Sequence, residues 1–183
     1  MQIKSEHITS SWSGGKTTEL FIYPQNAIYS ERNFDFRIST ATVEVEESEF
    51  TSLPNYLRIL SVIQGEVILS VNKQQTVKLN FGEQFSFSGA DHITSKGKIT
   101  DFNVIYSYDW EASLHCETIS ERKTFHKKAT SYAFLYIVSG NAIVGVHEVK
   151  SGDLILLEQG LAQDLVIDPT DEVICNYVEL VKR

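Results

Sequence analysis

Two stretches of the chain share one pattern, and together they indicate the fold class. Residues 57–71 read LRILSVIQGEVILSV, and residues 132–146 read YAFLYIVSGNAIVGV. Each places an apolar strand before a glycine and a second apolar strand after it. The two glycines, Gly65 and Gly140, lie 75 residues apart. Glycine adopts the positive φ of such a hairpin at little cost, whereas a β-branched residue does not.

A second glycine turn and strand follow each hairpin, as GEQFSF at residues 82–87 and GDLILL at residues 152–157. Turn, strand order and second turn recur together, which favours an internal repeat. The alternative is two unrelated hairpins, of which any all-β protein has several.

The composition also favours strands. Val, Ile, Thr, Phe, Tyr and Trp make 65 of 183 residues, and there are only 8 Ala. No convincing long amphipathic helix is present. Many short strands with turns between them predict a sandwich or barrel. The expected strands are 17–23, 36–46, 56–63, 66–71, 84–88, 102–108, 132–138, 141–146, 153–157, 164–167 and 173–181.

The repeated unit resembles the cupin barrel, a jelly-roll double sheet, here present twice as a bicupin. We therefore expect an N-terminal cupin-like barrel at residues 1–110 and a C-terminal cupin-like half at residues 111–183. In that family the ligand or metal lies in the mouth of the barrel.

Charge and composition exclude several classes of protein. The net charge is −8, and residues 1–110 and 111–183 each contribute −4, so no basic patch favours nucleic acid or an anionic membrane. No apolar run approaches the roughly 18 residues of a membrane span. The N-terminus shows no apolar signal segment. Two cysteines, Cys116 and Cys175, are too few for a disulfide framework, so we expect a cytoplasmic protein.

Metal and catalytic motifs are missing from the sequence. None of the five histidines stands two residues from another, so the His-x-His pair of metal-binding cupins is absent. We expect no metal and no cofactor. Ser13-Gly14-Gly15-Lys16-Thr17 lacks the first glycine of a phosphate loop and precedes a strand. Ser86-Phe87-Ser88-Gly89 lacks the first glycine of a nucleophile elbow.

A polar set in the first two thirds of the chain carries more information. Arg37 and Arg58 each stand between apolar residues of a predicted strand, so a buried guanidinium there needs a partner. Each could form a structural ion pair with Glu19 or Asp101, or hold a carboxylate ligand through its planar fork. Ser39 and Asn103 could add neutral hydrogen bonds.

Five ordered motifs in this region resemble the HutD/Ves family. That family carries W-x-G-G-x-T-x-E, then F-x-x-R-I-S-x-A, F-x-x-x-P-x-x-x-R-x-L, F-x-G, and D-x-N before an apolar residue. The aromatic residue that often stands directly before the arginine is here Phe36. The match is weaker over residues 111–183. The motifs match residues 12–19, 34–41, 50–60, 87–89 and 101–104.

The resemblance implies a bicupin, a homodimer and a ligand pocket in the N-terminal half. Some relatives are associated with bacterial histidine utilisation, where they are suggested to sense or limit a small acidic intermediate; others are associated with stress. The expected ligand-binding residues are Trp12, Gly14, Gly15, Thr17, Glu19, Arg37, Ser39, Arg58, Phe87, Asp101 and Asn103.

Three functions remain open. The first is a non-catalytic sensor or regulatory protein that binds a small carboxylate. The second is a metal-independent isomerase or hydrolase, with Glu19 and Asp101 as the candidate acid/base pair. The third is an interaction module in which Arg37 and Arg58 are paired internally and no pocket opens beside them.

Overall fold

The computed structural model describes residues 1–183, which its contacts divide into two units. His7–Asp109 form the N-terminal unit; Trp110–Arg183 together with Met1–Glu6 form the C-terminal unit. Apart from one short 3-10 helix, η1 (Tyr29–Glu31), every regular element is a β-strand. The expected all-β class is confirmed. No helix in the chain is long and apolar enough to cross a membrane.

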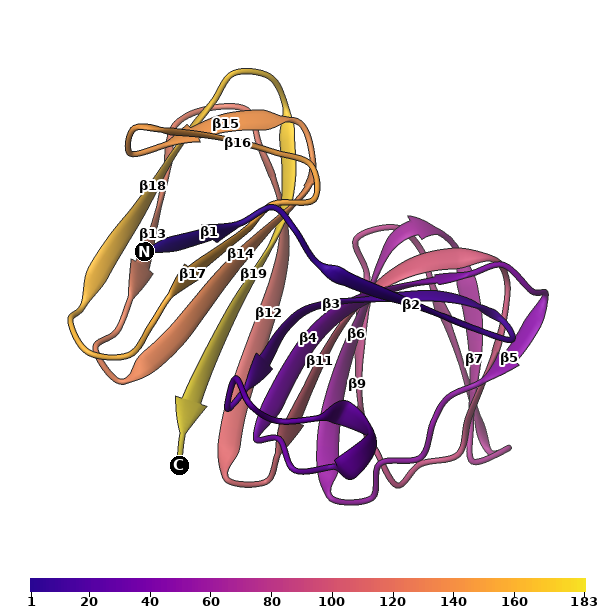
Figure 1. Ribbon diagram of the computed structural model, residues 1–183. Helices are drawn as coiled ribbons and strands as arrows, with labels where there is room; N and C mark the ends of the chain where they lie inside the picture. Colours follow the sequence, from indigo (N-terminus) through magenta and orange to yellow (C-terminus); the bar gives the residue numbers. More distant parts are fainter. The chain divides into compact units, whose positions relative to one another are not determined.

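The N-terminal unit consists of two antiparallel sheets (Figure 1). Its apolar core draws on both sheets. The six-stranded sheet runs in the order β2 (Ile8–Trp12), β3 (Gly15–Tyr23), β4 (Phe36–Val43), β11 (Ile99–Ser107), β6 (Tyr56–Gly65) and β9 (Gln84–Ser88). The four-stranded sheet runs in the order β5 (Glu47–Glu49), β10 (Ile93–Lys96), β7 (Val67–Val71) and β8 (Gln75–Leu79).

The C-terminal unit also has two antiparallel sheets and a core of its own. Its five-stranded sheet runs in the order β1 (Gln2–Lys4), β17 (Leu154–Leu157), β14 (Ser131–Ser139), β19 (Val173–Lys182) and β12 (Trp110–Ile119). Its four-stranded sheet runs in the order β13 (Lys123–Lys127), β18 (Gln163–Pro169), β15 (Asn141–Val144) and β16 (His147–Lys150).

The two units repeat one topology. The order β4-β11-β6-β9 recurs as β12-β19-β14-β17, and β5-β10-β7-β8 recurs as β13-β18-β15-β16. Gly65 and Gly140 occupy matching turns, with φ of 84° and 86°. A Cβ on Gly65 would lie 2.7 Å from the carbonyl oxygen of Lys98, and a Cβ on Gly140 would lie 2.3 Å from that of Glu172. The expectation of two similar cupin-type halves is confirmed.

The first strand of the chain joins the unit that lies last in the sequence. β1 pairs antiparallel with β17, and Ile3 lies opposite Ile155. Ile3 also packs against the core of the C-terminal unit. Residues 1–6, which the sequence analysis grouped with the first barrel, therefore belong to the second unit. The reason is that β1 supplies an edge partner for the buried strand β17.

Candidate ligand-binding pocket

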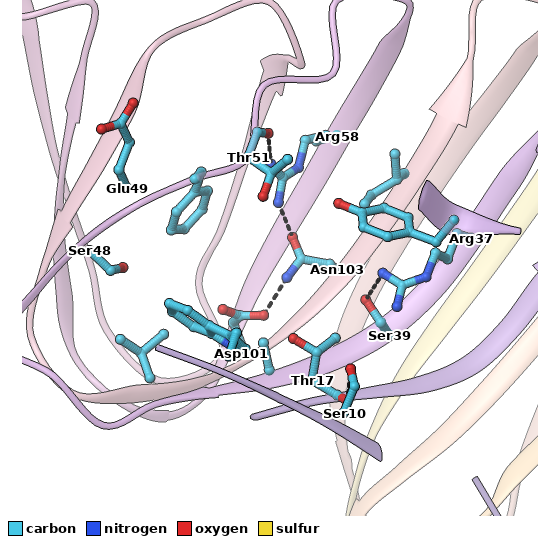
Figure 2. Close-up of a pocket in the computed structure, with 16 residues that line it drawn as sticks. Ser10, Thr17, Arg37, Ser39, Ser48, Glu49, Thr51, Arg58, Asp101 and Asn103 are labelled. Carbon is cyan, nitrogen blue, oxygen red and sulfur yellow. Dashed lines mark hydrogen bonds between the residues drawn. The ribbon is translucent and has the colours of Figure 1, made fainter. Parts of the chain in front are cut away.

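A cavity of about 290 Å³ opens inside the N-terminal unit (Figure 2). This volume lies near the lower end of the roughly 300–1,000 Å³ typical of small-molecule sites. One wall is the inner face of the six-stranded sheet, and the other includes β5 and the segment that follows it. The lining residues are Ser10, Trp12, Thr17, Tyr29, Arg37, Ser39, Ala41, Val43, Ser48, Glu49, Phe50, Thr51, Arg58, Asp101, Asn103 and Ile105.

Strand register brings the polar residues of the sheet wall together. Side chains two residues apart on a strand share a face, so Arg37 and Ser39 of β4 both point inward, as do Asp101 and Asn103 of β11. Asn103 lies opposite Ser39, while Ile105 lies opposite Arg37 on one side and Arg58 of β6 on the other. The two arginines therefore flank β11 at the same level of the sheet.

Arg37 has a carboxylate partner. Its Nε donates to Glu19 at 2.8 Å, and its Nη1 donates to the Ser39 hydroxyl at 3.2 Å. Its guanidinium also stacks on the Tyr29 ring, 4.3 Å from the centroid. Glu19 does not line the cavity. Of the alternatives that the sequence left open for Arg37, the structure shows the ion pair with Glu19.

Arg58 is a buried cation whose hydrogen bonds go to neutral oxygens. Its Nη2 donates to the side-chain oxygen of Asn103 at 3.2 Å, and its Nη1 donates to the main-chain oxygen of Thr51 at 3.3 Å. Its buried Nε has no hydrogen-bond partner. Burial lowers the pKa of Arg58, but a guanidinium titrates so high that it stays charged at neutral pH. The positive charge thus reaches the cavity without a carboxylate bound to it.

Two aromatic rings hold the Arg58 guanidinium in place. Its centre lies 5.1 Å from the Phe50 centroid and 5.0 Å from the Phe87 centroid. Contacts of this kind favour a cation and are stronger when it is shielded from water. Phe87 does not itself line the cavity. It acts on the site through Arg58.

Asp101 is the buried acidic residue of the wall, beside the two buried arginines. The side-chain amide of Asn103 donates to Asp101 Oδ1, as Figure 2 shows. Burial raises the pKa of Asp101 to about 7, although Arg58, the main-chain N–H of Ala41 and the Asn103 amide each act to lower it. Asp101 thus exchanges its proton near neutral pH, which is unusual for a carboxyl group.

The glycine motif before β3 builds the rim. Trp12 and Thr17 line the cavity, whereas Gly14 and Gly15 do not. A Cβ on Gly14 would lie 2.1 Å from the Trp12 ring, so the glycine leaves room for the indole to fold over the turn. A Cβ on Gly15 would lie 1.9 Å from the main-chain oxygen of Thr42, so this glycine lets β3 approach β4.

Most of the residues that the sequence analysis singled out lie together here. Trp12, Thr17, Arg37, Ser39, Arg58, Asp101 and Asn103 line the cavity, whereas Gly14, Gly15, Glu19 and Phe87 lie outside its lining. The lining also includes Ser10, Tyr29, Ala41, Val43, Ser48, Glu49, Phe50, Thr51 and Ile105, which the sequence analysis did not propose. Ala41 and Phe50 are specified positions of two of the family motifs, which offered a signal for them.

Histidines contribute nothing to the pocket wall. His92 pairs with Glu49 at 3.2 Å, and His126 of β13 pairs with Asp164 of β18 at 2.7 Å. The chain holds no group of three or more His, Cys, Asp or Glu side chains placed to bind a metal ion.

Two repeated units of this topology, with a polar cavity inside one of them, define a cupin-type protein. The match to a model of the HutD family covers residues 4–175, so the chain belongs to the HutD family.

Solved structures share this fold. HutD from Pseudomonas fluorescens SBW25 is 24% identical, with a TM-score of 0.81 and all of both chains covered. A conserved protein of unknown function from Pseudomonas aeruginosa PAO1 is 22% identical, with a TM-score of 0.82 over all of both chains. Oxalate decarboxylase from Bacillus subtilis is 7% identical, with a TM-score of 0.70, over 98% of this chain and 76% of that one. At these identities the likeness establishes the fold alone. A search of curated proteins found no match.

Proposed function

We propose that this HutD-family protein is a non-catalytic binding protein whose N-terminal unit holds a small carboxylate on Arg58. The observation that carries the proposal is that Arg58 is a buried cation with no carboxylate partner among its hydrogen bonds. Arg58 is 8% exposed and lines a cavity, and its hydrogen bonds go to two neutral oxygens. A buried cation is costly unless an anion compensates it.

The cavity suits a small anion in size and chemistry. A planar guanidinium binds a carboxylate through two parallel N–H donors, and such charge-assisted bonds are about twice as strong as neutral ones. The hydroxyls of Thr17, Ser39 and Ser48 and the ring of Trp12 line the same space and supply further contacts. The net charge of −8 does not oppose this, because the local field of the site governs recognition.

The family suggests which carboxylates to test first. Because some HutD relatives are associated with histidine utilisation, we propose an acidic intermediate of histidine breakdown as the ligand. A thermal-shift panel of formiminoglutamate, formylglutamate, urocanate, glutamate and histidine tests this. A ligand at about 100 times its Kd adds about 2.7 kcal/mol of stability. A shift with one acid that is lost in Arg58→Met supports the proposal, and no shift with any carboxylate contradicts it.

One observation favours a second function, a metal-independent enzyme. Asp101 lines the cavity and has a pKa of about 7, which suits a general acid or base. Glu19, the expected second member of the pair, is held by Arg37 and does not line the cavity. Turnover of a member of the panel, abolished by Asp101→Asn, would establish this function in place of the first.

The third function, an interaction module without a ligand, has only partial support. It expects both arginines to be paired internally with no cavity beside them. Arg37 fits, because Glu19 neutralises it, but Arg58 and the open cavity do not. The homodimer and the cytoplasmic location remain predictions, and sedimentation of the purified protein tests the first of them.

A further inference from the structure

Arg58 and Asp101 occupy the same wall of the cavity, joined by one amide. The Asn103 oxygen accepts from Arg58, and the Asn103 nitrogen donates to Asp101. An amide has its oxygen at one end and its NH2 group at the other, so this orientation is fixed by its two neighbours. Asn103 therefore presents its donor end to Asp101 and its acceptor end to the cation.

We propose that Asp101 is a recognition residue for the ligand, which it binds in its neutral form by donating a hydrogen bond to the carboxylate held on Arg58. The site then takes up one carboxylate and one proton together. The proton comes from solvent and binds the Asp101 carboxyl group, and no covalent bond to the ligand forms or breaks. This inference rests on the proposed carboxylate-binding function.

The charges around the cavity support this coupling. Arg37 and Glu19 cancel each other on β4 and β3, which leaves Arg58 on β6 and Asp101 on β11 as the buried charges. An ionised Asp101 would already balance Arg58, and a second anion would then be repelled. Glu49 also lies at the cavity wall, but its side chain is 65% exposed and pairs with His92, so water screens its charge.

The properties of Asp101 favour the neutral form. Asp101 is 2% exposed, and burial raises its pKa to about 7. An anion arriving in the cavity raises it further, because a like charge disfavours ionisation. A neutral carboxyl group gains an O–H donor that the ionised form lacks. The acidic ligand and the buried acid thus share one proton instead of repelling each other.

The experiment measures acetate binding against pH. Acetate is the minimal carboxylate, and it stays ionised between about pH 6 and pH 8, well above the ordinary pKa of a carboxyl group. Its Kd is obtained from thermal-shift titrations of the full chain, with chloride at equal ionic strength as the reference. We expect the wild-type Kd to increase with pH and to approach about tenfold per pH unit above pH 7.

Two variants assign the pH dependence to Asp101. Asp101→Asn removes the titrating group at nearly constant shape, and its acetate Kd should not change between about pH 6 and pH 8. His92→Gln removes the histidine that pairs with Glu49 at the cavity wall, and the wild-type pH dependence should persist. If Asp101→Asn does not fold, proton uptake by the wild type on addition of acetate in weakly buffered solution at about pH 7.5 decides the question.

The outcomes separate the two proposals. A wild-type Kd that is independent of pH, or no proton uptake, overturns the role of Asp101 while leaving carboxylate binding intact. Loss of the pH dependence in His92→Gln also overturns it. No stabilisation by acetate over chloride at about pH 6, where the coupled site is most occupied, contradicts the carboxylate site itself and the role of Asp101 with it.

Discussion

Arg58 and Asp101 line one cavity, yet the side chain of Asn103 lies between them and bonds to both. Arg58 donates to the Asn103 oxygen at 3.2 Å, and the Asn103 nitrogen donates to Asp101. A cation and an acid are thus both buried without neutralising each other directly. Buried charges without a direct ionic partner are costly, so we expect this arrangement to reduce the stability of the fold.

Asp101 should make the stability of the folded protein depend on pH. Its pKa is raised from 3.8 to about 7 on folding, so the folded state binds more protons than the unfolded state between these values. The free energy of unfolding therefore falls as pH increases through this window and levels off above it. Urea unfolding at about pH 5 and pH 8 measures the fall.

The variant Asp101→Asn isolates this contribution. It should be more stable than the wild type at about pH 8, and the difference should shrink towards about pH 5. Equal pH dependence in the two proteins would show that Asp101 does not titrate in this range.

The two neighbouring glycines of the rim should respond differently to alanine. Gly15→Ala forces a Cβ against the main-chain oxygen of Thr42, 1.9 Å away, which neither strand can avoid without moving. We expect a loss of about 2 kcal/mol or more. In Gly14→Ala the nearest atoms to the new Cβ belong to the Trp12 ring, which is 39% exposed, so we expect the ring to swing outward.

Thermal unfolding and tryptophan fluorescence together test this pair. Gly14→Ala should unfold close to the wild-type temperature but shift the emission of Trp12, because its ring moves into water. The other tryptophan, Trp110, is 2% exposed and gives a constant background. Equal destabilisation by the two substitutions would contradict the packing described for the turn.

Breaking the Arg37–Glu19 pair should affect stability and binding in opposite directions. Glu19→Gln replaces an ion pair, with its hydrogen bond of 2.8 Å, by a hydrogen bond from Arg37 to a neutral amide oxygen, and we expect a loss of about 1–2 kcal/mol. The Arg37 charge is then uncompensated beside the cavity, so acetate should bind more tightly. Glu66→Gln breaks an exposed pair with Lys78, and should change stability by less than about 1 kcal/mol. Unchanged acetate affinity in Glu19→Gln would show that the charge of Arg37 does not contribute to acetate binding.

The N-terminal strand should stabilise the C-terminal unit. Ile3→Ser removes an apolar side chain that packs against that core, at a cost of about 1 kcal/mol, since Ile3 is only partly buried. Gln2→Ser, an exposed position on the same strand, is the control. Hydrogen exchange should accelerate in β17 and β14 and stay unchanged in β6 and β11. Equal acceleration in both units would contradict the assignment of β1 to the C-terminal unit.

Strands with a clear apolar pattern were predictable from the sequence. Residues 84–88, for example, were expected as a strand and form β9. β12 was missed although it has ten residues, because polar side chains such as Glu111, His115 and Glu117 interrupt its pattern. β2 was missed because all five of its residues are exposed, so no alternation marks it. Both depend on partner strands rather than on their own composition.

The site was predictable in its residue types but not in its pairing. Arg37, Arg58, Asp101 and Asn103 were predicted from the sequence as site residues, but the partners of the two arginines were not. The pairing of Arg37 with Glu19 depends on the register of β3 against β4, which shifts between Glu19 and Phe21. The contact of Arg58 with Asn103 depends on the register of β11 against β6, which shifts between Thr100 and Asp101. No local pattern fixes a register across strands that lie tens of residues apart. Tyr29 gave no signal, since it lies on a single helical turn outside the sheets.

The most direct test of the account is acetate binding by Arg58→Met, measured at about pH 6 by thermal shift against chloride. Methionine fills much of the same space without the charge, and circular dichroism confirms that the variant folds. Arg122→Gln, which removes an exposed arginine paired with Asp168 on the C-terminal unit, is the control for general charge effects. We predict that Arg58→Met loses at least about tenfold in affinity while Arg122→Gln binds as the wild type does. Wild-type affinity in a folded Arg58→Met protein would contradict it.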